Sequence, residues 1–284
     1  MKTLKAKAYA KINLFLDVTG IRDDGYHLLD TVMQSVSLFD EIEVSLTEDT
    51  DVSISCNIDD LSGSNNIVFD ACKSFFEFSG WQSGLLIKIK KSIPIAAGTG
   101  GGSADAAAVL NILNKLSGKN YGSDVLCEIA LTLGADVPFC VCGGTARAKG
   151  IGEELYPIKT PKLYLVMLKN GEKKSTKEMY RRIDNEALTA TGNVDELIRG
   201  IETHNYELIY KNIYNAFTSC WDFESLTEIF KGFPYKSVFL SGSGPTVCAL
   251  FEEKQDAILT ANELKKRGYE AHFSSFCETG SAFE

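Results

Sequence analysis

The stretch that decides the fold is IPIAAGTGGGSADAAAVLNIL, which runs from Ile93 to Leu113. Four glycines cluster in this stretch: Gly98, Gly100, Gly101 and Gly102. Ser103 comes next, and an alanine-rich segment with helical spacing follows it. Glycine lets backbone N–H groups turn toward a ligand without a Cβ in the way. The N-terminus of a helix adds unpaired donors and a partial positive charge. The stretch therefore predicts a cradle for phosphate and indicates a nucleotide ligand.

Two better-known phosphate motifs do not match this stretch. A Walker loop ends in Gly-Lys-Ser/Thr, and no lysine occurs between Gly98 and Lys115. The dinucleotide fingerprint requires a glycine where Ser103 stands. A plain glycine turn before an ordinary helix stays open as the alternative, because glycine marks many loops that have no ligand.

The composition indicates a globular protein and argues against two kinds of partner. The chain has 284 residues, enough for one large or two medium domains, and a net charge of −9 without a long basic run. Nucleic-acid binding depends on clustered positive charge, so we expect no nucleic-acid partner. No run of about 18 apolar residues is present, so we expect no membrane partner either. A small phosphorylated ligand needs only local donors and is compatible with this charge.

The eight cysteines predict free thiols rather than a metal site. None of them forms a CxxC pair, and the three histidines are scattered along the chain. Several cysteines lie in apolar stretches, which is typical of buried thiols in a reducing cytoplasm. Lysines interrupt the N-terminal segment MKTLKAKAYAKINLFLDV, which argues against a signal peptide. We therefore expect a cytoplasmic protein.

The periodicity predicts an α+β protein with two parts. Apolar residues alternate with polar ones over residues 4–18, as in a strand with one buried face. Helical spacing over residues 66–78 and after the glycine loop (residues 97–103) predicts two helices. The glycine-rich, polar segment near residue 150 predicts a domain boundary. Beyond it, strands and helices follow in an order that favours an antiparallel sheet backed by helices.

Three segments together resemble the motifs of one family of small-molecule kinases. They are YAKINLFLDVTGIRDDGYH (residues 9–27), PIAAGTGGGSADAA (94–107) and FLSGSGPTV (239–247). In this order and spacing they resemble the family of galactokinase, homoserine kinase, mevalonate kinase and phosphomevalonate kinase. The first segment, with LGADVPF at residues 133–139, most closely resembles those members that phosphorylate 4-diphosphocytidyl-2-C-methyl-D-erythritol. The resemblance covers the whole chain.

The resemblance implies a fold and a reaction. The fold would be a two-domain α+β fold, with a ribosomal-protein-S5-like ATP-binding domain in residues 1–150. A ferredoxin-like antiparallel sheet with helices would form the substrate-binding domain in residues 151–284. The reaction would be transfer of phosphate from ATP, with Mg²⁺, to the 2-hydroxyl of that substrate, on the non-mevalonate route to isoprenoid precursors. Apart from the resemblance, we expect a monomer or weak homodimer and no dedicated metal site.

Lys11 and Asp136 are the candidate catalytic residues. Asp136 lies in a Gly-Ala-Asp-Val-Pro turn, where a rigid backbone would fix a carboxylate, and Lys11 shares a strand face with Asn13. The resemblance implies that Lys11 and Asp136 pair beside the substrate hydroxyl and that the lysine stabilises the transferring phosphoryl group. Taken alone, each residue is also consistent with a solvated lysine or a turn-capping aspartate.

The remaining candidates are residues of the two binding sites. The resemblance implies that Asn13, Tyr26, His27 and Tyr180 bind the substrate, with the aromatic rings around its cytosine; surface packing is the alternative for the two tyrosines. It implies that ATP contacts these residues: Asn66, Lys91, Pro94, Ala97, Gly98, Gly100, Gly101, Gly102 and Ser103. For Asn66 and Lys91, a helix cap and a solvated lysine at a strand end are the alternatives.

Three positions depart from the family pattern, and two other functions stay open. Tyr9 stands where proline is common, Thr99 where leucine is common, and Ala104 where a second serine is common. The last change removes a hydroxyl that would contact phosphate or metal. A kinase of the same family with a substrate that lacks cytidine is one alternative. The other is a nucleotide-binding module without catalysis, against which the presence of both Lys11 and Asp136 argues.

Overall fold

The computed structural model describes residues 2–172, 175–184 and 190–284, and in this part of the chain the strands form two sheets. The first sheet has the order β12-β1-β2-β4-β3, with the bounds Ser281–Phe283, Thr3–Ile21, His27–Thr47, Gly84–Lys90 and Val52–Cys56. Three short strands extend it: β5 (Thr145–Lys149), β6 (Glu154–Ile158) and β8 (Tyr214–Asn215). The second sheet is antiparallel, with the order β11-β7-β10-β9 and the bounds Glu270–Ser275, Tyr164–Lys169, Thr246–Phe251 and Ser237–Leu240.

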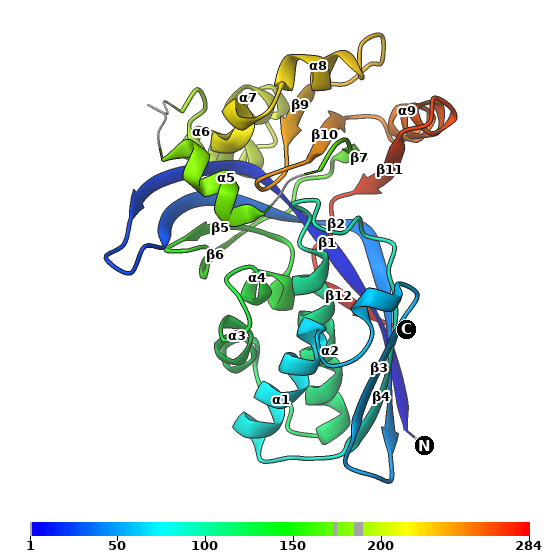
Figure 1. Cartoon of the computed structure of the whole chain (residues 1–284). Helices are drawn as coiled ribbons and strands as arrows, with labels where there is room; N and C mark the ends of the chain where they lie inside the picture. Colours follow the sequence, from blue (N-terminus) through cyan, green and yellow to red (C-terminus); the bar gives the residue numbers. More distant parts are fainter. Residues whose placement is uncertain (1, 173–174, 185–189) are drawn as a thin grey trace.

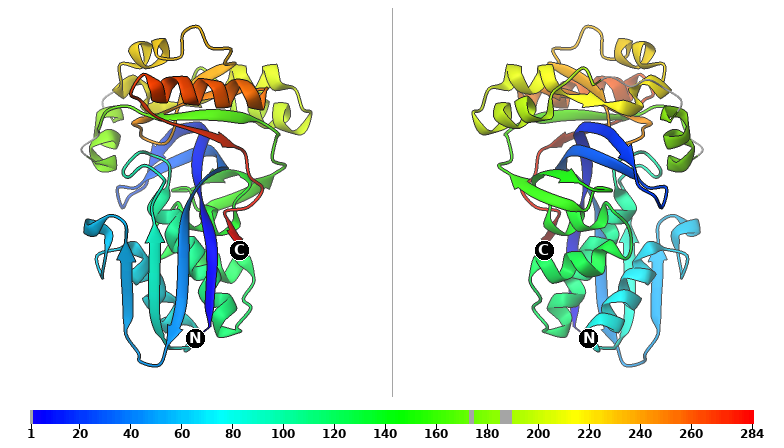
Figure 2. Two further views of the ribbon diagram at one scale, coloured as in Figure 1. Left: turned by 90° about the vertical axis from the view of Figure 1, so that its right-hand side faces the viewer. Right: turned by 90° about the vertical axis from the view of Figure 1, so that its left-hand side faces the viewer.

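The helices cover the two sheets separately. The first group packs with the first sheet: α1 (Ile67–Ser79), α2 (Gly101–Ser117), α3 (Ser123–Leu131) and α4 (Val137–Cys142). The second group surrounds the second sheet: α5 (Thr176–Ile183), α6 (Val194–Glu202), α7 (Tyr206–Asn212), α8 (Phe223–Glu228) and α9 (Lys254–Lys266). Single 3₁₀ turns are η1 (Asp59–Leu61) and η2 (Ala216–Cys220). Figures 1 and 2 show the two layers, with the long strands β1 and β2 reaching from the lower one into the upper one. The α+β architecture expected from the sequence is confirmed, as is the antiparallel second sheet.

The middle of β1 is buried on both faces, which the alternating pattern did not predict. Lys11 and Asn13, expected on a polar face, are 5% and 1% exposed. Leu16 of the same strand belongs to the hydrophobic core of the second layer, while Ile12 belongs to the first. The pairing with β2 also shifts between Asn13 and Phe15, and such a bulge changes the direction of neighbouring side chains. The second layer therefore covers the face of β1 that the sequence pattern assigned to solvent.

Helix α2 lies in the centre of the lower layer. Every residue from Ala104 to Leu110 is buried, because the alanines allow α1, α3, α4 and β1 to approach closely. The helix begins after Gly100 and ends at Gly118, and both glycines have a positive φ. Asn66 caps α1, with its side-chain oxygen accepting a hydrogen bond from the Val68 N–H. Gly100 thus sets the start of α2 at the residue where the chain leaves the glycine loop.

The sheet pairing bears on how the chain divides, although a boundary at residue 150 stays a prediction. β6 lies beyond that position and pairs with β5 of the first sheet. β12, at the end of the chain, pairs with β1. Several segments of the second half of the sequence are therefore part of the first sheet.

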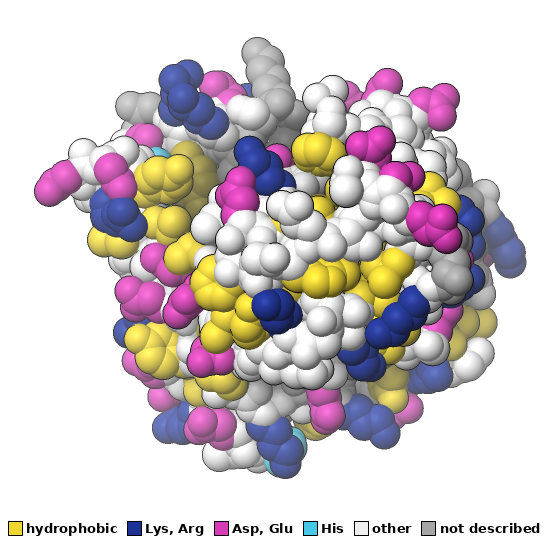
Figure 3. Space-filling view, turned by 90° about the horizontal axis from the view of Figure 1, so that it is seen from below, with side chains coloured by type: hydrophobic (Ala, Val, Ile, Leu, Met, Phe, Trp, Pro, Cys, Tyr) yellow, Lys and Arg dark blue, Asp and Glu magenta, His cyan; other side chains and the backbone are white. Residues whose placement is uncertain are grey.

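The lower end of the molecule carries an aromatic group at the end of α1. Phe75 and Phe76 contact the Trp81 ring edge-on, and Phe78 contacts Tyr121 in the same way. Figure 3 shows this end from below, with hydrophobic side chains interspersed among acidic and basic ones. Among the described helices, none combines the length and the apolar character that a membrane span requires.

Candidate active site

A cavity of about 510 Å³ lies where the two layers meet, a volume typical of small-ligand sites. Most residues that the sequence predicted for the site line this cavity: Lys11, Asn13, Asn66, Lys91, Pro94, Ala97, Gly98, Gly100, Gly101, Gly102, Ser103, Asp136 and Tyr180. Tyr26 and His27 do not line it. The structure therefore brings together segments that are far apart in the sequence.

Lys11 and Asp136 form an ion pair at the cavity wall. The Lys11 Nζ lies 3.1 Å from the Asp136 Oδ1, and it donates a second bond to the Asn13 Oδ1 at 3.1 Å. The Asn13 amide in turn donates to the Thr31 hydroxyl at 2.8 Å, which fixes its orientation. The Asp136 side chain is 40% exposed, whereas that of Lys11 is 6% exposed. A buried, oriented ammonium thus holds a carboxylate that ligands can reach.

The glycine loop is held between β1 and the SGSG turn of residues 241–244. The Lys11 N–H donates to the Thr99 carbonyl at 3.0 Å, and the Ser241 hydroxyl donates to the Gly98 carbonyl at 3.0 Å. A Cβ on Gly98 would lie 2.4 Å from the Ser241 carbonyl oxygen. Since Gly98 also has φ +80°, only glycine allows the two loops to approach this closely. The loop is therefore preorganised before the start of α2, where N–H groups point toward a ligand.

His27 and Tyr180 form an aromatic pair at the edge of the cavity. Their rings stack with centroids 4.3 Å apart, and the His27 Nε2 lies 2.6 Å from the Asp184 Oδ1. Burial and the nearby Asp136 carboxylate raise the pKa of the Tyr180 phenol, so this phenol stays neutral. Tyr26 is 59% exposed and has the Arg22 guanidinium over its ring.

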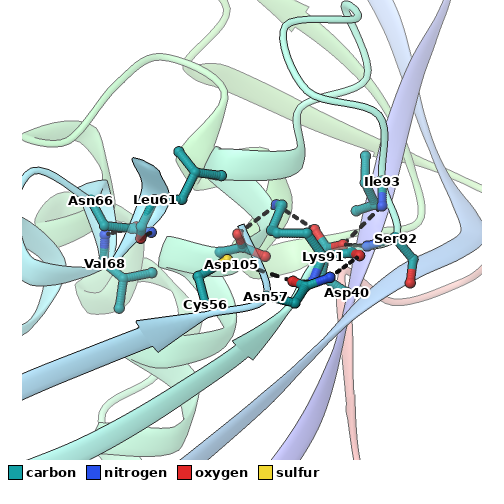
Figure 4. Close-up of polar contacts among 10 residues, drawn as sticks. All are labelled: Asp40, Cys56, Asn57, Leu61, Asn66, Val68, Lys91, Ser92, Ile93 and Asp105. Atoms are coloured by element: carbon teal, nitrogen blue, oxygen red, sulfur yellow. Dashed lines mark hydrogen bonds and ion pairs between the residues drawn. The ribbon is translucent and has the colours of Figure 1, made fainter. Parts of the chain in front are cut away.

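Lys91 is buried beneath the glycine loop in a group with two carboxylates (Figure 4). Its Nζ lies 2.5 Å from the Asp40 Oδ2 and 2.6 Å from the Asp105 Oδ2. The Lys91 side chain is 4% exposed, so it is not the solvated lysine that the sequence left as an alternative. Burial raises the pKa of Asp105, with a smaller contribution from Asp40, while Lys91 opposes the shift. We call this group the Lys91 triad.

Comparison with known proteins places the chain in a family. The pattern described as GHMP kinases N terminal domain matches residues 66–144, and that described as GHMP kinases C terminal matches residues 195–270. A 4-diphosphocytidyl-2-C-methyl-D-erythritol kinase of Clostridium perfringens (strain 13 / Type A) is 40% identical over 257 residues, which cover 88% of this chain and 89% of that protein. The chain belongs to this family of GHMP kinases.

Further matches agree with this assignment. A kinase of the same name from Caldicellulosiruptor saccharolyticus (strain ATCC 43494 / DSM 8903 / Tp8T 6331) is 38% identical, over 96% of each chain. The crystal structure of a 4-(cytidine 5'-diphospho)-2C-methyl-D-erythritol kinase superposes with a TM-score of 0.83 at 28% identity, covering 96% of this chain and 98% of that one. The family that the three sequence motifs indicated is thus confirmed.

Several residues that shape the site of this GHMP kinase were not among those predicted. Asp40 and Asp184 hold Lys91 and His27, respectively, from distant parts of the sequence. The Asn215 amide donates to the carbonyls of Leu240 and Gly242 and so holds the SGSG turn. For Asp40, the available signal was its position inside a strand, because an acidic residue that is buried there needs a partner for its charge. Asp184 and Asn215 gave no local signal.

Two of the departures from the family pattern lie at the glycine loop. Ala104 is fully buried and carries no hydroxyl, whereas the neighbouring Ser103 lines the cavity. Thr99 also lines the cavity, and its buried hydroxyl has no hydrogen-bond partner within the described part of the chain.

Replacing Gly100 by Ala is expected to lower turnover by about 10²-fold, because a small displacement of a catalytic group has an effect of this size. The new Cβ would lie 2.8 Å from the Lys11 Cγ and would displace the lysine stem. Gly118→Ala is a matched control: its φ of +71° resembles the +69° of Gly100, but a Cβ there meets nothing within 4 Å. Steady-state assays corrected for folded protein test this. Equal turnover in the two variants would contradict the role of the Gly100–Lys11 contact.

Proposed function

We propose that this kinase transfers the γ-phosphoryl group of ATP to the 2-hydroxyl of 4-diphosphocytidyl-2-C-methyl-D-erythritol, a step in the non-mevalonate synthesis of isoprenoid precursors. The observation that carries the proposal is the Lys11–Asp136 ion pair at 3.1 Å, in the same cavity as the glycine loop. The relatives that cover most of the chain bear the name of this kinase.

Asp136 and Lys11 have separate tasks in the reaction. The substrate hydroxyl oxygen forms a bond to the γ-phosphorus, the bond from that phosphorus to the ADP oxygen breaks, and Asp136 accepts the hydroxyl proton. Phosphoryl transfer passes through a loose transition state, so the proton leaves late and positioning contributes more than basicity. Lys11 is a fixed positive charge beside the transferring group and needs no reorganisation during the reaction.

ATP is bound by backbone donors of the glycine loop and the start of α2, with Asn66 and Lys91 at the neighbouring wall. Among the described residues no group of three or more acidic, His or Cys side chains forms a metal cage. Mg²⁺ does not need one, because it binds through one or two protein oxygens and the phosphates. Ser103 and Asp105 line the cavity, and the Asp105 Oδ1 is buried without a partner among the described atoms, so these two residues fit the ion. When bound, Mg²⁺ neutralises charge on the phosphates.

The cytidine end of the substrate is assigned to the aromatic pair. The stacked His27 and Tyr180 rings offer an aromatic surface and a ring nitrogen, and Asp184 orients the imidazole. Tyr26, which precedes His27 in the sequence, is exposed and is available to cover the base. Asn13 lines the cavity next to the Lys11 ammonium and is assigned to the hydroxyl-bearing end of the substrate.

A substrate panel tests the proposal directly. ADP release is measured with the cytidylylated substrate and, in parallel, with homoserine, galactose and mevalonate. We expect kcat/KM for the cytidylylated substrate to exceed the others by about 10⁴-fold, since a site built to pair with polar groups rejects ligands that lack them. Faster turnover of another alcohol would indicate the related kinase without a cytidine substrate. Tight ATP binding without ADP release from any alcohol would indicate a non-catalytic module.

Two finer properties complete the proposal. We assign the protein to the cytoplasm, because none of its eight cysteines, all within the described residues, forms a disulfide, as a reducing compartment favours. We assign it a monomeric or weakly dimeric state. Equilibrium sedimentation of the purified chain tests the second assignment.

A further inference from the structure

Two cysteines outside the active site lie with their sulfurs in contact. Cys127 is on α3, and Cys142 is the last residue of α4, the neighbouring helix in Figure 1. Their Sγ atoms are 3.4 Å apart, although the residues are 15 positions apart in the sequence. Both are free thiols; Cys142 is exposed and Cys127 is half-buried. Low-molecular-mass reagents can therefore reach the pair.

The contact makes the two thiols chemically different. The two sulfurs share a hydrogen bond in which either thiol can be the donor. This hydrogen bond lowers the pKa of Cys142 to about 7. The same hydrogen bond, and burial after it, raise the pKa of Cys127. A thiol with a pKa near the ambient pH is the best attacking group in thiol–disulfide exchange. Exposure and ionisation both favour attack by Cys142.

We propose that Cys127 and Cys142 form a redox-active thiol pair that a low-molecular-mass disulfide, such as oxidised glutathione, converts into an intramolecular disulfide. In the first step the Cys142 thiolate attacks one sulfur of the reagent, a mixed disulfide forms, and one glutathione thiolate leaves. In the second step Cys127 gives up its proton and attacks the Cys142 sulfur, and the second glutathione leaves. The two protein thiols are oxidised by two electrons, and the reagent is reduced to two thiols.

The geometry of the helices allows the bond and connects it to the catalytic residues. The sulfurs have to approach from 3.4 Å to about 2.0 Å, a change that side-chain rotation and a small helix shift can supply. α4 begins directly after Asp136, so the disulfide would restrain the C-terminal end of the helix that follows the candidate base. Closing this loop removes conformational freedom from the unfolded chain and is expected to raise the melting temperature by about 5 °C.

The test uses the full chain and oxidised glutathione as the oxidant. Free thiols are alkylated after oxidation, and peptides are mapped by mass spectrometry. We expect a peptide that links Cys127 to Cys142 and a protein mass lower by two hydrogens, both reversed by dithiothreitol, together with the increase in melting temperature. Absence of the linked peptide in the wild-type chain would overturn the proposal, and so would linkage of either residue to a different cysteine.

Single substitutions test the order of the two steps. Cys127→Ser is expected to stop at the mixed disulfide and retain glutathione on Cys142. Cys142→Ser is expected to form neither the mixed disulfide nor the linked peptide at this site. Cys56→Ser is the control, since Cys56 is also partly exposed but its thiol contacts Asn57, and it should behave like the wild type. Glutathione retained on Cys127 in the Cys142→Ser chain, and none on Cys142 in Cys127→Ser, would reverse the assigned roles.

Discussion

Asp136→Asn is expected to lower kcat by about 10³-fold, with ATP affinity nearly unchanged, because a positioned base has an effect of this size. The substitution keeps the shape of the side chain but removes the oxygen that accepts the substrate proton. It also removes the negative partner of the Lys11 ammonium, which lies 3.1 Å away. Lys11→Ala is expected to lower kcat by a similar factor, since it removes the fixed charge beside the phosphoryl group. Steady-state kinetics and calorimetric ATP titration separate the two effects.

Asp70→Asn is the control for this experiment. Asp70 lies in the first turn of α1, is exposed, and does not line the cavity. Its replacement should leave kcat within about two-fold of the wild type, as is usual for a surface substitution. If Asp136→Asn behaved like Asp70→Asn, Asp136 would not be the base. If both Asp136→Asn and Lys11→Ala abolished ATP binding, their role would be in nucleotide binding instead of transfer.

The sequence was sufficient for those parts of the site that local pattern and motif identify. Residues of the glycine loop and Asp136 lie in turns with a distinctive composition, and all of them line the cavity. Lys11 and Asn13 were correctly placed on one strand, since side chains two residues apart share a face. What the pattern could not show was that this face is buried. That depends on the second layer, whose core includes Leu16 of the same strand.

Residues held by distant partners were the ones that sequence reasoning placed least well. Lys91 at the end of a strand looks like a solvated lysine, because its partner Asp40 is 51 positions away and joins it only through sheet pairing. His27 and Asp184 are 157 positions apart, and no local pattern connects them. In both cases the sequence identifies one charged or polar group, but tertiary structure determines which group pairs with it. The partner then determines whether the side chain contacts a ligand itself or holds another residue that does.

Lys91→Met is expected to lower the free energy of unfolding by about 3–5 kcal/mol, since removing one partner of a buried ion pair leaves uncompensated charge. Here the buried carboxyl groups left without the lysine are those of Asp40 and Asp105, whose side chains are 0% and 3% exposed. The Asp40 carboxylate also accepts hydrogen bonds from the N–H groups of Ser92 and Ile93, so its displacement would disturb the segment that leads into the glycine loop. Urea unfolding of the variant and the wild type measures the loss.

The loss should depend on pH in a defined direction, which distinguishes charge from packing as its cause. Burial raises the pKa of Asp105 and Lys91 opposes the shift, so removing Lys91 raises that pKa further above its unfolded value. A carboxyl with a raised folded pKa stabilises the fold below its unfolded pKa and loses that contribution as pH rises through the folded pKa. Because the folded pKa of Asp105 is already about 8 in the wild type, the two chains diverge only above that pH, and the deficit of Lys91→Met should be larger at about pH 9 than at about pH 6. Lys90→Met, which removes an exposed lysine paired with Glu41, should show almost no deficit at either pH. A deficit of Lys91→Met that stayed constant with pH would mean that lost packing of the lysine stem, not the charge of the Lys91 triad, destabilises the fold.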